Sequence, residues 1–389
     1  MIFRDGIVRR VRSERPGFQV IEVEITAAPD TIATDHLAVG DTVAANNYPD
    51  LTGVVRLGSR VRIEGSALAK TLGTGGAATV TALLDELPSD SLPAGHIVKA
   101  RYTPSQVMVS SIDEQDAPDH ELLAQATSLE GLGVIAFDLH SQLPAIIAGI
   151  RSVRSDARVV YVYTDGGALP VQFSNVAAGL LNADWITEIV SCGQAFGGTM
   201  EAASLASALL AAHTLCGADI VIAGQGPGNL GTGTPYGFSG TEVGAILNTT
   251  AALSGVPIAC MRISDADRRE RHWGVSHHSL RAVGNLALAR VNIPLPLFDR
   301  DTCEEFNIGG GQQPGGHSEL IAFEDRIKQQ LRDSGIAERH ILHRVSTAQW
   351  QKDFADIPVG LSTMGRSLSQ DPVIFLSAYA AGIFAAEKL

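Results

Sequence analysis

Short stretches in which apolar and polar residues alternate dominate the first 100 residues of the chain. Clear examples are "GFQVIEVEI" (17–25), "TGVVRLGSRVRIEG" (52–65) and "GGAATVTALL" (75–84). Such alternation is the pattern of a strand with one buried face. Several short strands separated by turns indicate a small β-barrel or sandwich. We therefore expect a barrel-like domain over residues 1–110.

The pattern changes at about Leu132, where the apolar runs become continuous. Five runs follow, with centres roughly 25–40 residues apart: "GVIAFD", "RVVYVYTD", "TEIVSCG", "DIVIAG" and "VPIACMRIS". Continuous apolar runs are typical of strands buried on both faces, and this spacing leaves room for a crossover helix between each pair. The pattern predicts an α/β fold with a doubly wound, mostly parallel sheet.

The segments between and after these runs read as helices. "MEAASLASALLAAHTLCG" is rich in alanine and leucine and ends at Gly217, a residue suited to terminate a helix. "SGTEVGAILNTTAALSG" opens with Ser239 and Glu242 at capping-box spacing. Two more helices are expected at 318–335 and 373–389. The apolar tail helix should pack on the core or on a second subunit, which would make the protein a homo-oligomer.

A polar segment separates the two parts of the chain. "SIDEQDAPDHE" (111–121) holds five carboxylates and a proline, which favours a linker or an exposed loop. We therefore assign residues 111–125 to a linker and residues 126–389 to an α/β domain with a C-terminal helical extension.

Composition narrows the class of protein. A net charge of −13 and a pI near 5.3 disfavour a nucleic-acid partner. The four cysteines are far apart and form no C-x-x-C pair, which argues against a thiolate zinc site. The N-terminus has no apolar signal core, and the longest apolar stretches are broken or short for a bilayer. We expect a cytoplasmic protein with no membrane partner.

Polar, glycine-rich loops follow all five apolar runs. In an open parallel sheet, ligands bind at the carboxyl ends of the strands, so these loops should share one site. They span residues 138–141, 164–170, 193–198, 224–240 and 264–279.

The fourth loop, "GQGPGNLGTGTPYGFSG", contains the glycine spacing of a dinucleotide-binding turn at Gly226, Gly228 and Gly231. Its helix, however, is predicted to begin near Ser239, and the acid that would hold a ribose is missing. No Gly-Lys-Ser/Thr follows, so a Walker loop is excluded as well, and NAD is disfavoured. The remaining interpretations are a purely structural turn or an anion site, whose residues would be Gly226, Gly228, Gly231, Thr232, Gly233 and Thr234.

The segment "RERHWGVSHHS" (269–279) is the densest in titratable groups. Side chains of His277 and His278 would point about 100° apart on a helix, so we expect only one of them to face a given ion. His272 could approach either of them only through the bend that Gly274 permits. Arg262 and the arginines of this segment either clamp an anionic substrate or pair with nearby acids.

Three interpretations of these side chains stay open. The first is a divalent-metal site for Mg²⁺, Mn²⁺ or Zn²⁺ built from Asp138, His140, Asp165 and His277. The second is metal-free acid–base catalysis by His277, His278, Asp165 and His140. In the third, the histidines serve only the hydrogen bonding of their loops.

Several motifs together resemble a known bacterial family. They include "GHIVKARYTPSQ", "DLHSQLP", "YTDGGALP", "GPGNLGTGT" and "RISDADRRERHWGVSHHS". From about Gly40 to Pro296 the chain resembles the family catalogued as domain of unknown function 3866, although "GDTVAANNYPD" departs from the threonine-rich turn expected there. The resemblance implies the two-part architecture and carries no established activity.

Two functions from different classes fit these observations. The first is an enzyme, a hydrolase or group transferase, that acts on a small anionic metabolite such as a phosphorylated or nucleotide-like compound, with a metal assisting. The second is a non-catalytic metabolite-sensing or scaffold protein that uses the same loops.

Overall fold

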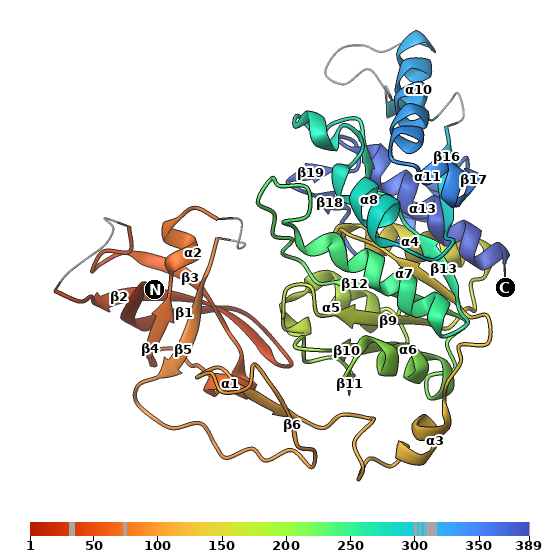
Figure 1. Ribbon diagram of the computed structural model, residues 1–389. Coiled ribbons are helices and arrows are strands. Elements are labelled where there is room, and N and C mark those ends of the chain that lie inside the picture. Colours follow the sequence, from red (N-terminus) through yellow and green to blue (C-terminus); the bar gives the residue numbers. More distant parts are fainter. Residues whose placement is uncertain are drawn as a thin grey trace. The chain divides into compact units, whose positions relative to one another are not determined.

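The computed structural model describes residues 1–30, 36–72, 76–298, 302, 305, 306, 308 and 317–388. The chain forms two compact units, Met1–Val109 and Ser110–Leu389. The first contains a closed barrel and the second a parallel sheet flanked by helices (Figure 1), so the predicted fold class is confirmed.

The first unit is built around a barrel with the strand order β1-β2-β3-β5-β4. Alternate residues such as Val8, Ile21, Val23 and Ile63 point inward and are fully buried, as the alternating pattern predicts. The barrel strands are β1 (Phe3–Arg15), β2 (Phe18–Ala27), β3 (Thr42–Asn47), β4 (Arg60–Glu64) and β5 (Ala78–Leu83). The unit also contains α1 (Pro49–Thr52), α2 (Ser66–Ala69) and a hairpin of β6 (Ile97–Lys99) and β7 (Val107–Val109).

The second unit contains a parallel sheet with the order β11-β10-β9-β12-β8-β13-β16-β17 in the described part of the chain. All five predicted runs are strands of this sheet and are largely buried. The strands are β8 (Gly133–Ala136), β9 (Val159–Thr164), β10 (Glu188–Cys192), β11 (Met200–Ala202), β12 (Ile220–Gln225), β13 (Val256–Ala259), β16 (Asn292–Leu297) and β17 (Ile341–Ser346).

Helices cover both faces of this sheet (Figure 1). Helix α4 (Leu143–Val153) packs with α13 (Pro372–Glu387) on one face, and α6 (Leu205–Thr214) with α7 (Glu242–Ala252) on the other. The helices that follow the neighbouring strands β8 and β12 thus lie on opposite faces, which opens a crevice at the carboxyl ends of these strands. The other α-helices of this unit within the described residues are α3 (His120–Gln125), α5 (Asn175–Asn182), α8 (His277–Arg281), α10 (His317–Asp333), α11 (Ile336–Arg339) and α12 (Trp350–Ala355).

The tail helix α13 belongs to the core. Its residues from Pro372 to Ala386 are buried, and it crosses α4 at the pair Gly149 and Gly382. A Cβ built on Gly382 would lie 3.0 Å from the Cα of Gly149 and would collide with the carbonyl of Ile146. Within the described residues, no helix is both long and apolar enough to cross a membrane.

Three strands of the sheet were not predicted. Strand β11 is only three residues long, β16 contains two prolines ("NIPLPL"), and β17 at the sheet edge alternates in burial. Length and proline content hide such strands from a search for continuous apolar runs.

The predicted capping box at the start of α7 is wrong, although the predicted helix is present. A 3₁₀ turn (Ser239–Thr241) precedes α7, and the Ser239 hydroxyl accepts a hydrogen bond from the Leu230 backbone instead of capping the helix. Glu242 likewise accepts hydrogen bonds from the loop after β9.

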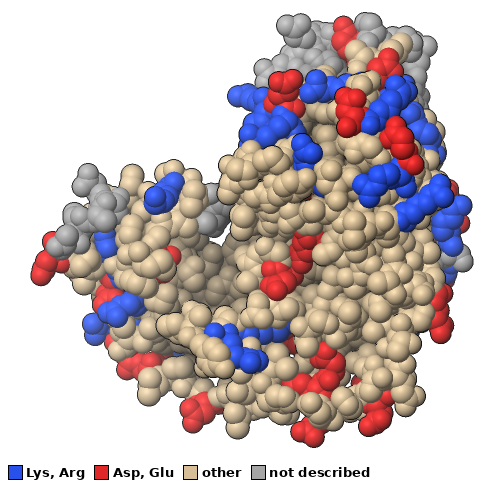
Figure 2. Space-filling model, viewed as in Figure 1, with Lys and Arg blue, Asp and Glu red and all other residues tan. Residues whose placement is uncertain are grey.

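The polar segment at 111–125 lies within the second unit. The Ser111 backbone donates to Glu114 Oε1 (2.6 Å), the Ser111 hydroxyl donates to the Glu201 carbonyl (3.2 Å), and both Ser111 and Glu114 are buried. On the face that Figure 2 shows, basic and acidic side chains are interspersed.

Candidate functional site

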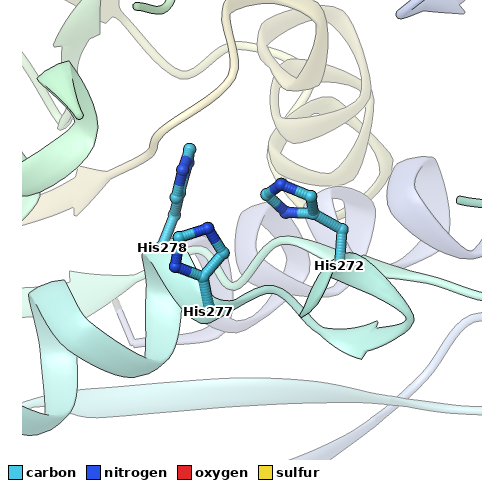
Figure 3. Close-up of side chains that lie close together, drawn as sticks. All are labelled: His272, His277 and His278. Atoms are coloured by element: carbon cyan, nitrogen blue, oxygen red, sulfur yellow. The ribbon is translucent and has the colours of Figure 1, made fainter. Parts of the chain in front are cut away.

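Three histidines from one chain segment come together at the carboxyl edge of the sheet (Figure 3). His272 ends the 3₁₀ turn Glu270–His272, and His277 and His278 open α8. One nitrogen from each ring lies within 4.8 Å of the others. The ring centroids are 4.4 Å apart for His277 and His278, 4.9 Å for His272 and His277, and 5.0 Å for His272 and His278.

Local sequence explains this convergence. Gly274 has φ +78°, a conformation that favours glycine, and a Cβ there would collide with Gln330. This bend pairs β15 (Gly274–Val275) with β14 (Ile263–Ser264), after which Ser276 caps α8. Contrary to the expectation that only one of the adjacent histidines faces a given ion, both contribute a nitrogen to the cluster.

The rings of His272 and His278 make their hydrogen-bond contacts through Nδ1. His272 Nδ1 lies 2.7 Å from the Ser276 hydroxyl, and His278 Nδ1 lies 3.3 Å from Asp138 Oδ2. In both rings this leaves Nε2 available. His277 Nε2 is buried and has no hydrogen-bond partner among the described residues. The His278 ring also stacks on Phe238, with centroids 4.0 Å apart and planes 1° from parallel.

The environment keeps the imidazoles of His272 and His277 neutral. Burial, aided by the positive charges of Arg262 and Arg269, lowers the pKa of His272 to about 2. Burial and the proximity of His278 lower the pKa of His277 to about 4. A neutral imidazole is the form that binds a metal or accepts a proton. Both rings are therefore in the ligating form at neutral pH.

Asp138, a predicted metal ligand, instead lies behind His278. Its side chain is 2% exposed, and its Oδ1 accepts a hydrogen bond from Asn229 Nδ2 (2.8 Å). Its Oδ2 lies 3.3 Å from His278 Nδ1 and 3.8 Å from Arg262 Nη1. A Cβ at Gly240 would collide with this carboxylate, so glycine is required there. A carboxylate on the far nitrogen of a histidine is the usual outer support of a metal-binding imidazole.

Arg262 lies between two acids at the base of the site. It is 3% exposed, with Nη1 3.8 Å from Asp138 and Nη2 3.5 Å from Asp267. Its Nε has no hydrogen-bond partner among the described residues. Asp267 is itself bound in a fork by Arg269, at 2.9 and 2.8 Å. The Arg262 guanidinium thus retains donor capacity beside the histidines.

The backbone of the glycine-rich loop also reaches the site, in addition to the side chains of Asn229 and Phe238. A Cβ on Gly231 would lie 3.9 Å from His278 Nε2, so the loop backbone passes beside this ring. The Gly226 backbone packs against the Tyr163 hydroxyl, where a Cβ could not fit. The Thr232 and Thr234 hydroxyls lie 2.9 Å apart and bond within the loop, which is exposed there.

Two other predicted anion-binding residues, Gly228 and Gly233, belong to the same loop. Gly228 (φ +132°) and Gly233 (φ +81°) allow it to turn, and α7 begins only at Glu242. Their proposed role in holding an anion stays a prediction.

His140 and Asp165 do not join the histidine cluster. Both nitrogens of His140 are engaged, Nδ1 at 3.2 Å from the Tyr161 hydroxyl and Nε2 at 2.6 Å from the Ser174 hydroxyl. Burial lowers the pKa of His140 to about 4. Asp165 is exposed and follows β9, beside Gly193. In place of these two residues, the structure brings in His272, through the bend at Gly274 that the sequence had indicated as the condition for its approach.

An open cleft of ≈ 1230 Å³ begins on the loop that carries His272. Its lining combines apolar side chains with acids and arginines: Asp265, Asp267, Arg268, Arg269, Trp273, Phe306 and Arg366 among others.

Fold and site together define a protein with a small β-barrel followed along the chain by a doubly wound α/β unit. A histidine cluster lies at the carboxyl edge of the α/β unit's sheet. The chain belongs to the family described as protein of unknown function (DUF3866), which matches residues 44–382. The match thus extends beyond Pro296 into the tail helix. No curated protein matches the chain.

Proposed function

We propose that the protein is a metal-dependent enzyme acting on a small anionic metabolite, with His272, His277 and His278 as the metal ligands. The convergence of three imidazole nitrogens within 4.8 Å carries this proposal. A three-histidine set with an open fourth position is a common ligand set of catalytic zinc. Zn²⁺ is therefore the preferred ion, ahead of Mg²⁺ and Mn²⁺, which favour oxygen ligands.

Hydrolysis or group transfer is the chemistry that such a site supplies. A metal with three protein ligands lowers the pKa of a bound water and turns it into a nucleophile near neutral pH. Asp138 supports this role, because its contact with His278 Nδ1 orients the ring and leaves Nε2 for the metal.

The position of Arg262 is the reason for proposing an anionic substrate. Its guanidinium is buried beside the histidines and retains an Nε donor without a partner among the described residues. A carboxylate or phosphate oxygen bound at the metal would satisfy such a donor. The Gly226–Thr234 loop would close the site on the side of His278. We further propose a cytoplasmic location, on the grounds of the sequence.

A thermal-shift screen of phosphorylated metabolites, with and without Zn²⁺, Mn²⁺ or Mg²⁺, tests the substrate class. A ligand at a hundred times its dissociation constant adds about 2.7 kcal/mol to the free energy of unfolding. Compounds that stabilise the protein should do so only with the metal present, and the protein should convert them to product. His277→Ala should abolish turnover. The control is His213→Ala, which should not, because His213 lies on α6 next to Glu130 and outside the histidine cluster. Metal-dependent binding without turnover of any hit would favour the sensor function instead.

A further inference from the structure

A second polar cluster lies where β9 and β12 end. Thr164 is the last residue of β9, Gln225 is the last residue of β12, and the two are direct partners across this parallel pair. Glu242, the first residue of α7, reaches the same point. Its carboxylate accepts hydrogen bonds from the backbone N–H groups of Asp165 and Gly166, each at 3.0 Å.

One buried oxygen in this cluster lacks a donor. Gln225 is 3% exposed, and its Oε1 has no hydrogen-bond partner among the described residues. A Cβ on Gly166 would touch both Gln225 Oε1 and Glu242 Oε2, the latter at 2.5 Å. An amide oxygen and a carboxylate oxygen therefore converge on the same space, which only glycine leaves open. A buried acceptor without a donor, next to a carboxylate oxygen, is costly unless a cation or a proton lies beside it.

The charge of the cluster is negative. Burial raises the pKa of Glu242, and the charge of Asp165 raises it further, while the Thr164 hydroxyl and the two backbone N–H groups offset this only in part. The groups that shift this pKa include no lysine or arginine of the described chain. A bound cation would supply the missing positive charge.

We propose that Glu242, Gln225 Oε1 and Thr164 Oγ1 form a site for a hard divalent cation, Ca²⁺ or Mg²⁺, next to the loop after β9. Carboxylate, amide and hydroxyl oxygens are the ligands that these ions prefer, in contrast to the imidazoles that suit Zn²⁺. Glu242 is only half-buried, so water can complete the coordination. The cation would join the ends of β9 and β12 to the start of α7. It would hold the base of the glycine-rich loop, which begins at Gly226.

The full chain, first freed of metal with a chelator, is titrated with CaCl₂ and with MgCl₂ to test this site. Calorimetry measures binding, and thermal unfolding measures the change in Tm. Wild-type protein should bind one of the two ions saturably, with a rise in Tm. Glu242→Gln should weaken binding at least tenfold. Glu188→Gln is the control and should bind as the wild type does, because Glu188 is the first residue of β10 and lies at the amino end of the strands, away from the proposed site.

Two further variants keep the proposal falsifiable and separate it from the histidine site. Gln225→Leu removes the amide, including Oε1, but leaves Glu242 in place. It should also weaken binding at least tenfold, so the test survives if Glu242→Gln does not fold. His277→Ala should bind Ca²⁺ or Mg²⁺ unchanged, even if the zinc proposal fails. Wild-type protein that binds neither ion, or variants of Glu242 and Gln225 that bind normally, would overturn the assignment.

Discussion

Asp138 connects several residues around the histidine cluster without being part of the cluster. It contacts His278 at Nδ1, Asn229 from the glycine-rich loop and the buried Arg262. The sequence identified it as a metal ligand because it follows a strand of the sheet. Only the structure shows that its carboxylate contacts His278 and lies outside the histidine cluster, since the direction of a side chain in a loop depends on its tertiary contacts.

Asp138→Asn should therefore weaken zinc binding without removing a ligand. An amide at this position can donate to His278 Nδ1, which favours the tautomer that carries its proton on Nε2, and loss of such support typically costs about 10–100-fold in affinity. Competition titration with a zinc chelator measures the change. Unaltered affinity would show that Asp138 does not orient His278.

His140 should make the protein sensitive to acid. Its pKa is about 4 in the folded chain, against about 6.5 in an unfolded one. As pH falls from 6.5 to 4, the unfolded chain takes up a proton that the folded chain refuses, so this contribution destabilises the fold below pH 6.5. The full difference corresponds to about 3 kcal/mol.

His140→Gln tests this, because glutamine is polar but does not titrate. Urea unfolding at pH 8 and pH 5 should give a smaller loss of stability for the variant than for the wild type. Equal losses in the two proteins would show that His140 is not the group responsible.

At the scale of elements, α4 and α13 can approach closely because two glycines meet at their crossing. Gly382→Ala should place a methyl group against the Ile146 carbonyl and the Gly149 Cα. Overpacking of this kind costs about 1–3 kcal/mol. Gly360→Ala is the matched control, because a Cβ there meets nothing within 4 Å. Chemical denaturation of both variants measures the difference, and a Gly382→Ala protein as stable as the control would refute the close crossing.

Strands that bury a continuous apolar stretch could be predicted from the sequence. Strands whose conformation depends on pairing with a neighbouring strand could not. The runs that became β8, β9, β10, β12 and β13 are apolar because both faces of the sheet are covered. Strand β16 contains prolines and β17 is an edge strand, so tertiary pairing decides their conformation. The sequence indicated that His272 could approach the other two histidines through a bend at Gly274, but it did not predict all three as one ligand set. The cluster needs the positive φ of Gly274, and periodicity carries no information about whether such a bend forms.

At the scale of the whole molecule, the histidine cluster and its supports all lie in the unit Ser110–Leu389. We therefore expect a fragment of residues 110–389 to fold and to bind zinc with the affinity of the full chain. Circular dichroism and zinc titration of the fragment check this. A folded fragment that binds no zinc would show that the barrel contributes to the site.

The central claim is that three histidines hold a metal. Its most direct measurement is the metal content of the purified full chain by mass spectrometry, after incubation with Zn²⁺ and removal of the excess. A three-histidine site should hold about one zinc per chain, and a folded variant that carries His272→Ala and His277→Ala should hold none. Wild-type protein free of metal, or a variant that retains it, would contradict the claim.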